Sequence, residues 1–179
     1  MMRQLILGAA VDELKVSNLA NFTLDKVATR AGVPPRTIQQ FWPNTPELFA
    51  ATVTSYASRH LPELPDTGTL YGDLLQYATA YADMVNTPTG RRLLDSQIVR
   101  PSDWDLAGAR EEYFTSRHRW AAPIVSRGID RGECSPMTDP GRTIDTLTLT
   151  VCMPVLVYDR PITVEDCEYA VQLVVRGIS

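Results

Sequence analysis

The most constraining feature of the sequence is a glycine followed closely by two prolines, Gly32 and Pro34–Pro35, between two short apolar patterns. Glycine readily adopts the left-handed backbone that closes a helix, and proline suits the first turn of a helix but not its interior. The apolar positions before the glycine recur at helical spacing: Leu24, Val27, Ala28 and Ala31. The sequence therefore predicts one helix that ends at Gly32 and a short second helix from about Pro35 to Phe41.

Hydroxyl and acidic residues mark the helix starts on either side of this turn. Thr23 can cap the helix that ends at the glycine, and Asp25 suits the positive end of that helix. Thr45-Pro46-Glu47 combines a capping hydroxyl, a proline at the first helical position and an acid in the first turn. A further helix is predicted to begin there, and an earlier amphipathic helix is predicted over residues 5–16.

The rest of the chain is helical in period beyond a proline-containing linker at residues 61–68. Helices are predicted over residues 71–85, 89–99, 103–129, 144–158 and 164–178. The β-prone residues 148–151 and the nearby Pro154 leave a strand open as an alternative there. The pattern as a whole predicts an all-α chain, with a three-helix head over residues 1–46 and a helical bundle over residues 47–179.

Two short helices joined by a tight glycine turn form the helix-turn-helix pattern. The two helices cross closely, and Ala28 supplies the small residue that the crossing needs. Ile38 and Phe41 are expected to face inward and to complete a small core with Leu24, Val27 and Val33. The side chains left outward on the second helix are a cation, a hydroxyl and two amides, groups that bond phosphates and base edges: Arg36, Thr37, Gln39 and Gln40.

The charge distribution agrees with a nucleic-acid partner only when it is divided by region. The whole chain carries a net charge of −4, which taken alone argues against a polyanion partner. Residues 1–60 hold 6 basic and 4 acidic side chains, whereas residues 61–179 hold 11 and 17. No acid occurs from Lys26 to Pro46. A weakly basic head on an acidic body is therefore expected.

The sequence of the head resembles the sequences of the TetR family of transcriptional regulators. The similarity runs without a gap from Ile6-Leu7 through Ala31-Gly32-Val33 to Leu48-Phe49, and Gly128–Glu133 with the terminal helices resembles the ligand and dimerisation domain of the family. The resemblance implies a homodimer that binds a pseudo-palindromic DNA operator and leaves it when a small organic effector enters the body. The DNA contacts expected are Thr23, Lys26, Pro34, Pro35, Arg36, Thr37, Gln39, Gln40 and Thr45.

Several positions depart from the family pattern. Gln39 stands where a tyrosine usually holds the DNA backbone, Trp42 replaces a phenylalanine, and Thr45 replaces a lysine. Pro34 replaces a serine, and only Arg3 precedes the first helix. These departures predict weaker and less salt-sensitive DNA binding than is usual in the family. They also leave an alternative, a helical small-molecule-binding or protein-interaction module whose DNA head has decayed.

In the body, aromatic and polar-tipped side chains are candidates for an effector pocket, although core packing is the commoner role for any one of them. These candidates are Tyr77, Tyr81, Met84, Trp104, Phe114, His118 and Met153. The last two helices are apolar on more than one side and therefore need more than one partner. Residues expected to divide between the dimer interface and the inner core are Leu147, Val151, Val155, Val171 and Val174.

Other classes of protein find little support in the sequence. The nucleophile, nucleotide and metalloprotease motifs are missing, so no enzyme activity and no cofactor are expected. Cys134, Cys152 and Cys167 are widely spaced, which argues against a disulfide scaffold and against a metal site. No apolar run is long enough for a membrane span, so a cytoplasmic location is expected.

Overall fold

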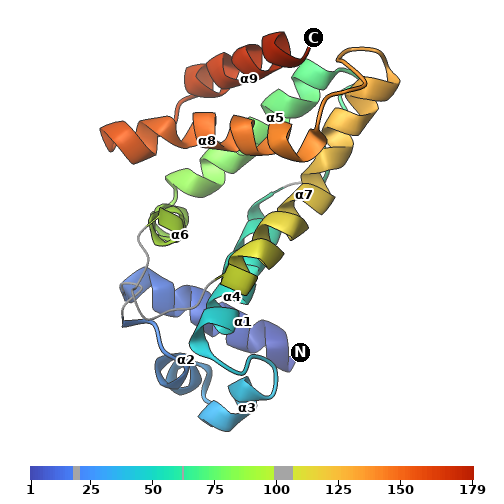
Figure 1. The fold of residues 1–179 in the computed structure, drawn as a ribbon. Coiled ribbons are helices and arrows are strands. Elements are labelled where there is room, and N and C mark those ends of the chain that lie inside the picture. Colours follow the sequence, from blue (N-terminus) through green and yellow to red (C-terminus); the bar gives the residue numbers. More distant parts are fainter. Residues whose placement is uncertain (18–20, 62, 99–106) are drawn as a thin grey trace. The chain divides into compact units, whose positions relative to one another are not determined.

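The computed structural model describes residues 1–17, 21–61, 63–98 and 107–179, apart from the side chains of residues 95–98, 107–114, 116 and 118. Every regular element in the described part is a helix, as the sequence predicts (Figure 1). The strand considered at residues 148–151 is wrong, because these residues lie inside a helix. The chain forms two compact units, Met1–Arg59 with Pro88–Tyr113 and His60–Thr87 with Phe114–Ser179. From here on these two units are called the head and the body, so the head now extends beyond the three predicted helices of residues 1–46.

The head is built from helices α1 (Met2–Val16), α2 (Leu24–Ala31), α3 (Pro35–Gln39), α4 (Thr45–His60) and α6 (Pro88–Ile98). Helix α1 packs against α2 and α6, and α2 packs against α3. Large apolar side chains from several of these helices and from the segment before α2 are fully buried: Ile6, Phe22, Val27, Ile38 and Leu48.

One arginine joins α6 to the end of α1 within the head. The Nη1 atom of Arg92 donates to the carbonyl oxygens of Leu14, at 3.3 Å, and Ser17, at 3.1 Å. The last carbonyls of a helix have no partner within the helix, so a cation that binds them stabilises the helix end. The contact attaches α6 to the first helix of the chain.

The body contains α5 (Leu70–Asn86), α8 (Pro140–Tyr158), α9 (Val164–Ile178) and the part of α7 (Ala107–Asp130) from residue 114 onward. Helix α5 packs against α8 and α9, which also pack against each other (Figure 1). The predicted bounds of α9 are confirmed, whereas α8 begins four residues before the predicted start. The Asp139 carboxylate caps α8 by accepting from the Arg142 amide at 3.0 Å.

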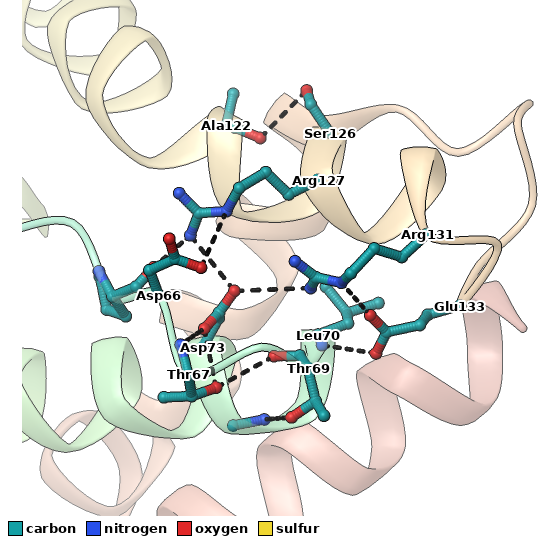
Figure 2. A network of polar contacts seen from close by, with 12 residues as sticks. Asp66, Thr67, Thr69, Leu70, Asp73, Ala122, Ser126, Arg127, Arg131 and Glu133 are labelled. Carbon is teal, nitrogen blue, oxygen red and sulfur yellow. Dashed lines mark hydrogen bonds and ion pairs between the residues drawn. The ribbon is translucent and has the colours of Figure 1, made fainter.

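A polar network holds the start of α5 against the end of α7, and its centre is the fully buried Asp73 (Figure 2). One oxygen of this carboxylate accepts from the amide and hydroxyl of Thr67, at 2.6 and 2.8 Å. The other lies 3.2 Å from Nη2 of Arg127 and 3.6 Å from Nη2 of Arg131. Burial alone raises the pKa of Asp73, but the hydrogen bonds from Thr67 and the hydrogen bond and charge of Arg127 outweigh burial and hold the pKa below its ordinary value.

The segment Gly128–Glu133 supplies the other half of this network. Glu133 accepts from the backbone amide of Leu70 at 2.6 Å and forms an ion pair with Arg131 (Figure 2). A Cβ atom at Gly128 would lie 2.9 Å from a methyl group of Leu70, so any larger residue there would have to displace the Leu70 side chain. Gly132 has a φ of 74°, which lets the chain turn back toward α5. This segment therefore fixes the start of α5.

Candidate nucleic-acid interface

The turn between α2 and α3 is built as the sequence predicts. Thr23 caps α2 by accepting from the Lys26 amide at 3.3 Å. Gly32 has a φ of 67°, and the amide of Val33 donates to the carbonyl of Ala28 at 3.1 Å, which closes the helix. The extended Pro34 then leads directly into α3. Local signals within a few residues fix this turn.

The inner side of the turn differs from the prediction at one position. Ala28 and Ile38 are buried as expected, but Phe41 is 36% exposed, so its expected inward position is wrong. Helix α3 ends at Gln39. Phe41 lies beyond the helix, so helical spacing does not predict which way its side chain faces. Trp42 takes the inner place instead, with only 4% of its surface exposed.

The outer side of the turn carries most of the predicted DNA contacts. Arg36 and Gln39 of α3 and Gln40 directly after it are exposed, and Thr37 is half-buried. Exposed residues that precede them on α2 and in the turn are Lys26, Pro34 and Pro35. Exposed cation, amide and hydroxyl groups on a short helix over a buried Ile38 can bond to phosphates and to base edges in a groove.

The start of α4 is capped by a different residue from the one predicted. Oδ1 of Asn44 accepts from the Glu47 amide at 2.9 Å, and Nδ2 of Asn44 donates to Oε1 of Glu47 at 3.0 Å. The capping role expected of Thr45 is therefore wrong, because Thr45 is already the first residue of α4. The signal was readable, since a capping residue followed three positions later by glutamate is a capping box. Thr45 is half-buried.

One of the cations near the turn is used inside the head. Nε and Nη2 of Arg30 lie 2.9 and 2.8 Å from Oε2 of the buried Glu13, which also accepts from the Ser17 hydroxyl. The Ser17 hydroxyl lowers the pKa of Glu13, burial opposes it, and Arg30 lowers the pKa further, to a net value below the ordinary one. The positive charge of Arg30 is therefore compensated, so the exposed basic surface of the turn comes from other residues.

Comparison with known proteins gives the chain its family. Residues 64–174 match the family model described as "Tetracyclin repressor-like, C-terminal domain". The HTH-type transcriptional regulator AqdR of Rhodococcus erythropolis is 28% identical over 81% of this chain and 70% of its own length. The chain belongs to the TetR family of transcriptional regulators. It is therefore a transcriptional regulator, as the resemblance of its head implies.

Solved structures show the same fold along the whole TetR-family chain. The crystal structure of the TetR family transcription regulator SCO0332 has a TM-score of 0.80, is 27% identical, and the match covers 99% of this chain and 98% of that one. The transcriptional regulator FadR of Bacillus subtilis, solved with stearoyl-CoA, has a TM-score of 0.73 and is 18% identical, with 98% and 99% covered. The all-helical fold predicted from the sequence is confirmed.

The expected effector residues of this TetR-family body do not all lie together. Tyr77, Tyr81 and Met84 are buried on α5, where the rings of Tyr77 and Tyr81 are 6.2 Å apart. Trp120 of α7 joins them, with its ring 5.9 Å from that of Tyr77. Met153 on α8 is not buried like these side chains, because 45% of its surface is exposed. Trp104 and the side chains of Phe114 and His118 lie outside the described residues.

The five residues expected to divide between core and dimer interface are all in the core of the body. Their exposed fractions within the single chain range from 0 to 6%: Leu147, Val151, Val155, Val171 and Val174. A different set of apolar side chains faces outward at intervals of four residues: Leu149, Met153 and Val157 on α8, and Tyr169 and Leu173 on α9. This outward set is named the α8–α9 outer face. The sequence reasoning missed it as a set, although the spacing of four was visible in the sequence.

The cysteines of the regulator are packed as apolar side chains. Cys134, Cys152 and Cys167 are free thiols and buried. Burial raises the pKa of Cys152 and that of Cys167 to about 11, so both thiols stay protonated and unreactive near neutral pH. The residues that the structure describes contain no cluster of three or more metal-binding side chains. None of the described helices is both long and apolar enough to cross a membrane.

Proposed function

We propose that this TetR-family regulator is a repressor that binds operator DNA through α3 of each subunit of a dimer and releases it when a small organic molecule enters the body. One observation carries the DNA-binding part: Arg36 and Gln39 are exposed on a short helix, with Gln40 exposed directly after it, and the buried Ile38 and the Gly32 turn anchor this helix. In this proposal residues 1–46 read DNA and residues 47–179 bind the effector and the second subunit.

DNA binding is tested by fluorescence anisotropy with duplex DNA taken from upstream of the gene. We expect saturable, sequence-dependent binding, and a loss of about tenfold in affinity for Arg36→Ala, because Arg36 is an exposed cation of α3. Lys15→Ala is the matched control, since Lys15 is an exposed cation on α1 that forms an ion pair with Asp12 at 2.7 Å. Failure of the wild-type protein to bind at low salt would refute the proposal and favour the module that has lost DNA binding.

The α8–α9 outer face supports a dimer formed by a second copy of the chain. Its apolar side chains are exposed on two helices that pack against each other, and exposed apolar surface of this kind marks contact surfaces. We expect a light-scattering mass of about twice the 19.9 kDa of one chain, and close to 19.9 kDa for the double variant Leu149→Asp, Met153→Asp. Leu5→Asp, at an exposed leucine of α1, is expected to remain dimeric. A monomeric wild-type protein would contradict the proposed dimer.

The aromatic cluster of the body supports an organic effector. Tyr77, Tyr81 and Trp120 place three rings between α5 and α7, and such surfaces bind apolar organic molecules. The same fold holds stearoyl-CoA in the FadR structure. We expect acyl-CoA or smaller aromatic compounds, screened as a panel, to release the bound duplex, and Tyr81→Ala to weaken that release. Compounds that release the wild-type and variant proteins equally would remove Tyr81 from the effector site.

A further inference from the structure

Arg3 lies beside the end of the DNA-reading helix, although the sequence places it far away. The sequence predicted Arg3 in an arm ahead of the first helix, and this is wrong because α1 begins at Met2. The guanidinium carbon of Arg3 lies 5.2 Å from the centre of the Trp42 ring and 6.0 Å from that of Phe41. Both rings lie within three residues of the end of α3. A cation from the first turn of α1 is therefore fixed at the end of α3.

The geometry leaves the hydrogen-bonding groups of Arg3 available. A guanidinium that lies over an aromatic ring uses its face for that contact, while its N–H donors point outward in its own plane. Arg3 and Phe41 are both exposed, whereas Trp42 is buried and gives the pair a rigid base. The Phe41 and Trp42 rings are 5.7 Å apart and tilted by 53°, so two aromatic rings lie close to the Arg3 guanidinium.

The cations of the head differ in whether they form ion pairs. Arg30 forms an ion pair with Glu13 and Lys15 with Asp12, while Arg59 donates to Gln4 at 2.9 Å. Within the described part of the chain, Arg3, Lys26 and Arg36 form no ion pair. No ion pair neutralises the charges of these three cations, and Arg3 is the one that lies beside the residues that follow α3.

We propose that Arg3 is a DNA backbone contact, held by Phe41 and Trp42 so that its N–H groups bind a phosphate beside the groove that α3 enters. This inference rests on the proposed function, because it requires that α3 binds duplex DNA. A planar fork of N–H donors matches the geometry of a phosphate, and the aromatic contact reduces the conformational entropy that Arg3 loses on binding.

The test is an anisotropy titration of the full chain with a labelled duplex of mixed sequence at several KCl concentrations. Each phosphate contact contributes about 0.9 to the slope of log affinity against log salt concentration, so Arg3→Ala should reduce this slope by about 0.9 per subunit and weaken binding about 5- to 10-fold at low salt. Lys15→Ala removes the same charge from the same helix and should leave the slope unchanged. Arg3→Lys should retain the slope and part of the affinity.

A second variant separates the aromatic support from the charge. Phe41→Ala keeps Arg3 and removes part of its support, so the slope should persist while affinity falls about 2- to 3-fold, and circular dichroism checks that each variant is folded. An unchanged slope for Arg3→Ala, in a chain whose wild type binds the duplex, would overturn the inference and leave the proposed function intact. A wild-type chain that does not bind the duplex at all would overturn both.

Discussion

The head and the body each bury a carboxylate against arginine, but the two carboxylates differ in the number of arginines and hydrogen-bond donors around them. Glu13 of the head is 5% exposed and joins α1 to α2 through one arginine, Arg30, whose own side chain is 38% exposed. Asp73 of the body is fully buried and has two arginines, Arg127 and Arg131, in addition to two hydrogen bonds from Thr67.

The difference shows how each unit compensates the cost of a buried charge. A buried carboxylate is stabilised only when several donors replace the water that it loses. Asp73 has these donors from three residues in two segments of the chain, so the network fixes the start of α5 on α7. Glu13 depends on Ser17 and on an arginine that water reaches, so the link between α1 and α2 is the weaker of the two.

The largest expected effect is the loss of the Asp73 carboxylate. Asp73→Ala leaves Arg127 and Arg131 close together without their central counter-charge, and we expect the free energy of unfolding to fall by about 3–5 kcal/mol. Urea denaturation followed by circular dichroism measures this change. Asp66→Ala is the control, because Asp66 is 71% exposed and lies 4.0 Å from Arg127; it should cost less than about 0.5 kcal/mol. Equal losses for the two variants would contradict the central role of Asp73.

A smaller loss is expected when the equivalent charge in the head is removed. Glu13→Ala breaks the bonds to Ser17 and Arg30, but the released guanidinium can reach water, so we expect a loss of about 1–3 kcal/mol. Asp12→Ala changes the neighbouring acid, which is exposed and pairs with Lys15, and serves as the control. The comparison of the two units would be wrong if Glu13→Ala destabilised the chain more than Asp73→Ala.

Acid should lower the free energy of unfolding by protonating the carboxylates of Glu13 and Asp73. Their pKa values are lower in the folded chain than their ordinary values, so their contribution is present above about pH 4 and is lost as the pH falls through the folded pKa. We expect the free energy of unfolding to fall steeply below about pH 4, less so in Asp73→Asn and Glu13→Gln. Urea midpoints measured at successive pH values give the slope. A wild-type acid slope in both variants would exclude these two groups as its source.

The smallest expected effect concerns the contact that places α6 in the head. Arg92→Ala removes two hydrogen bonds to the carbonyls at the end of α1, and we expect a loss of about 0.5–1.5 kcal/mol. Hydrogen exchange at the last turn of α1 should become faster. Arg92→Lys retains the charge and one donor group, so it should fall between the wild type and the alanine variant. Unchanged exchange in Arg92→Ala would show that this contact does not hold the helix end.

Much of the head could be predicted from the sequence because its signals act over a few residues. Thr23, Gly32 and Pro35 each act on atoms within about one helical turn, and the structure has them in the expected roles. The mistakes at Phe41 and Thr45 were also local. Phe41 lies past the end of a short helix, where the helical period no longer applies. The cap of α4 is Asn44, which pairs with Glu47, and not Thr45.

The sequence by itself determined the helices, most of their ends, the helix-turn-helix and the regional imbalance of charge, because each depends on near neighbours or on composition. Only the tertiary structure decided which side of α8 and α9 is buried, since a helix that is apolar on two sides has two equivalent solutions until a neighbour such as α5 covers one. It also decided which cations form ion pairs. Arg30 meets a glutamate 17 residues away, whereas Arg3 meets two aromatic rings, and contacts at such separations leave no periodic trace in a sequence.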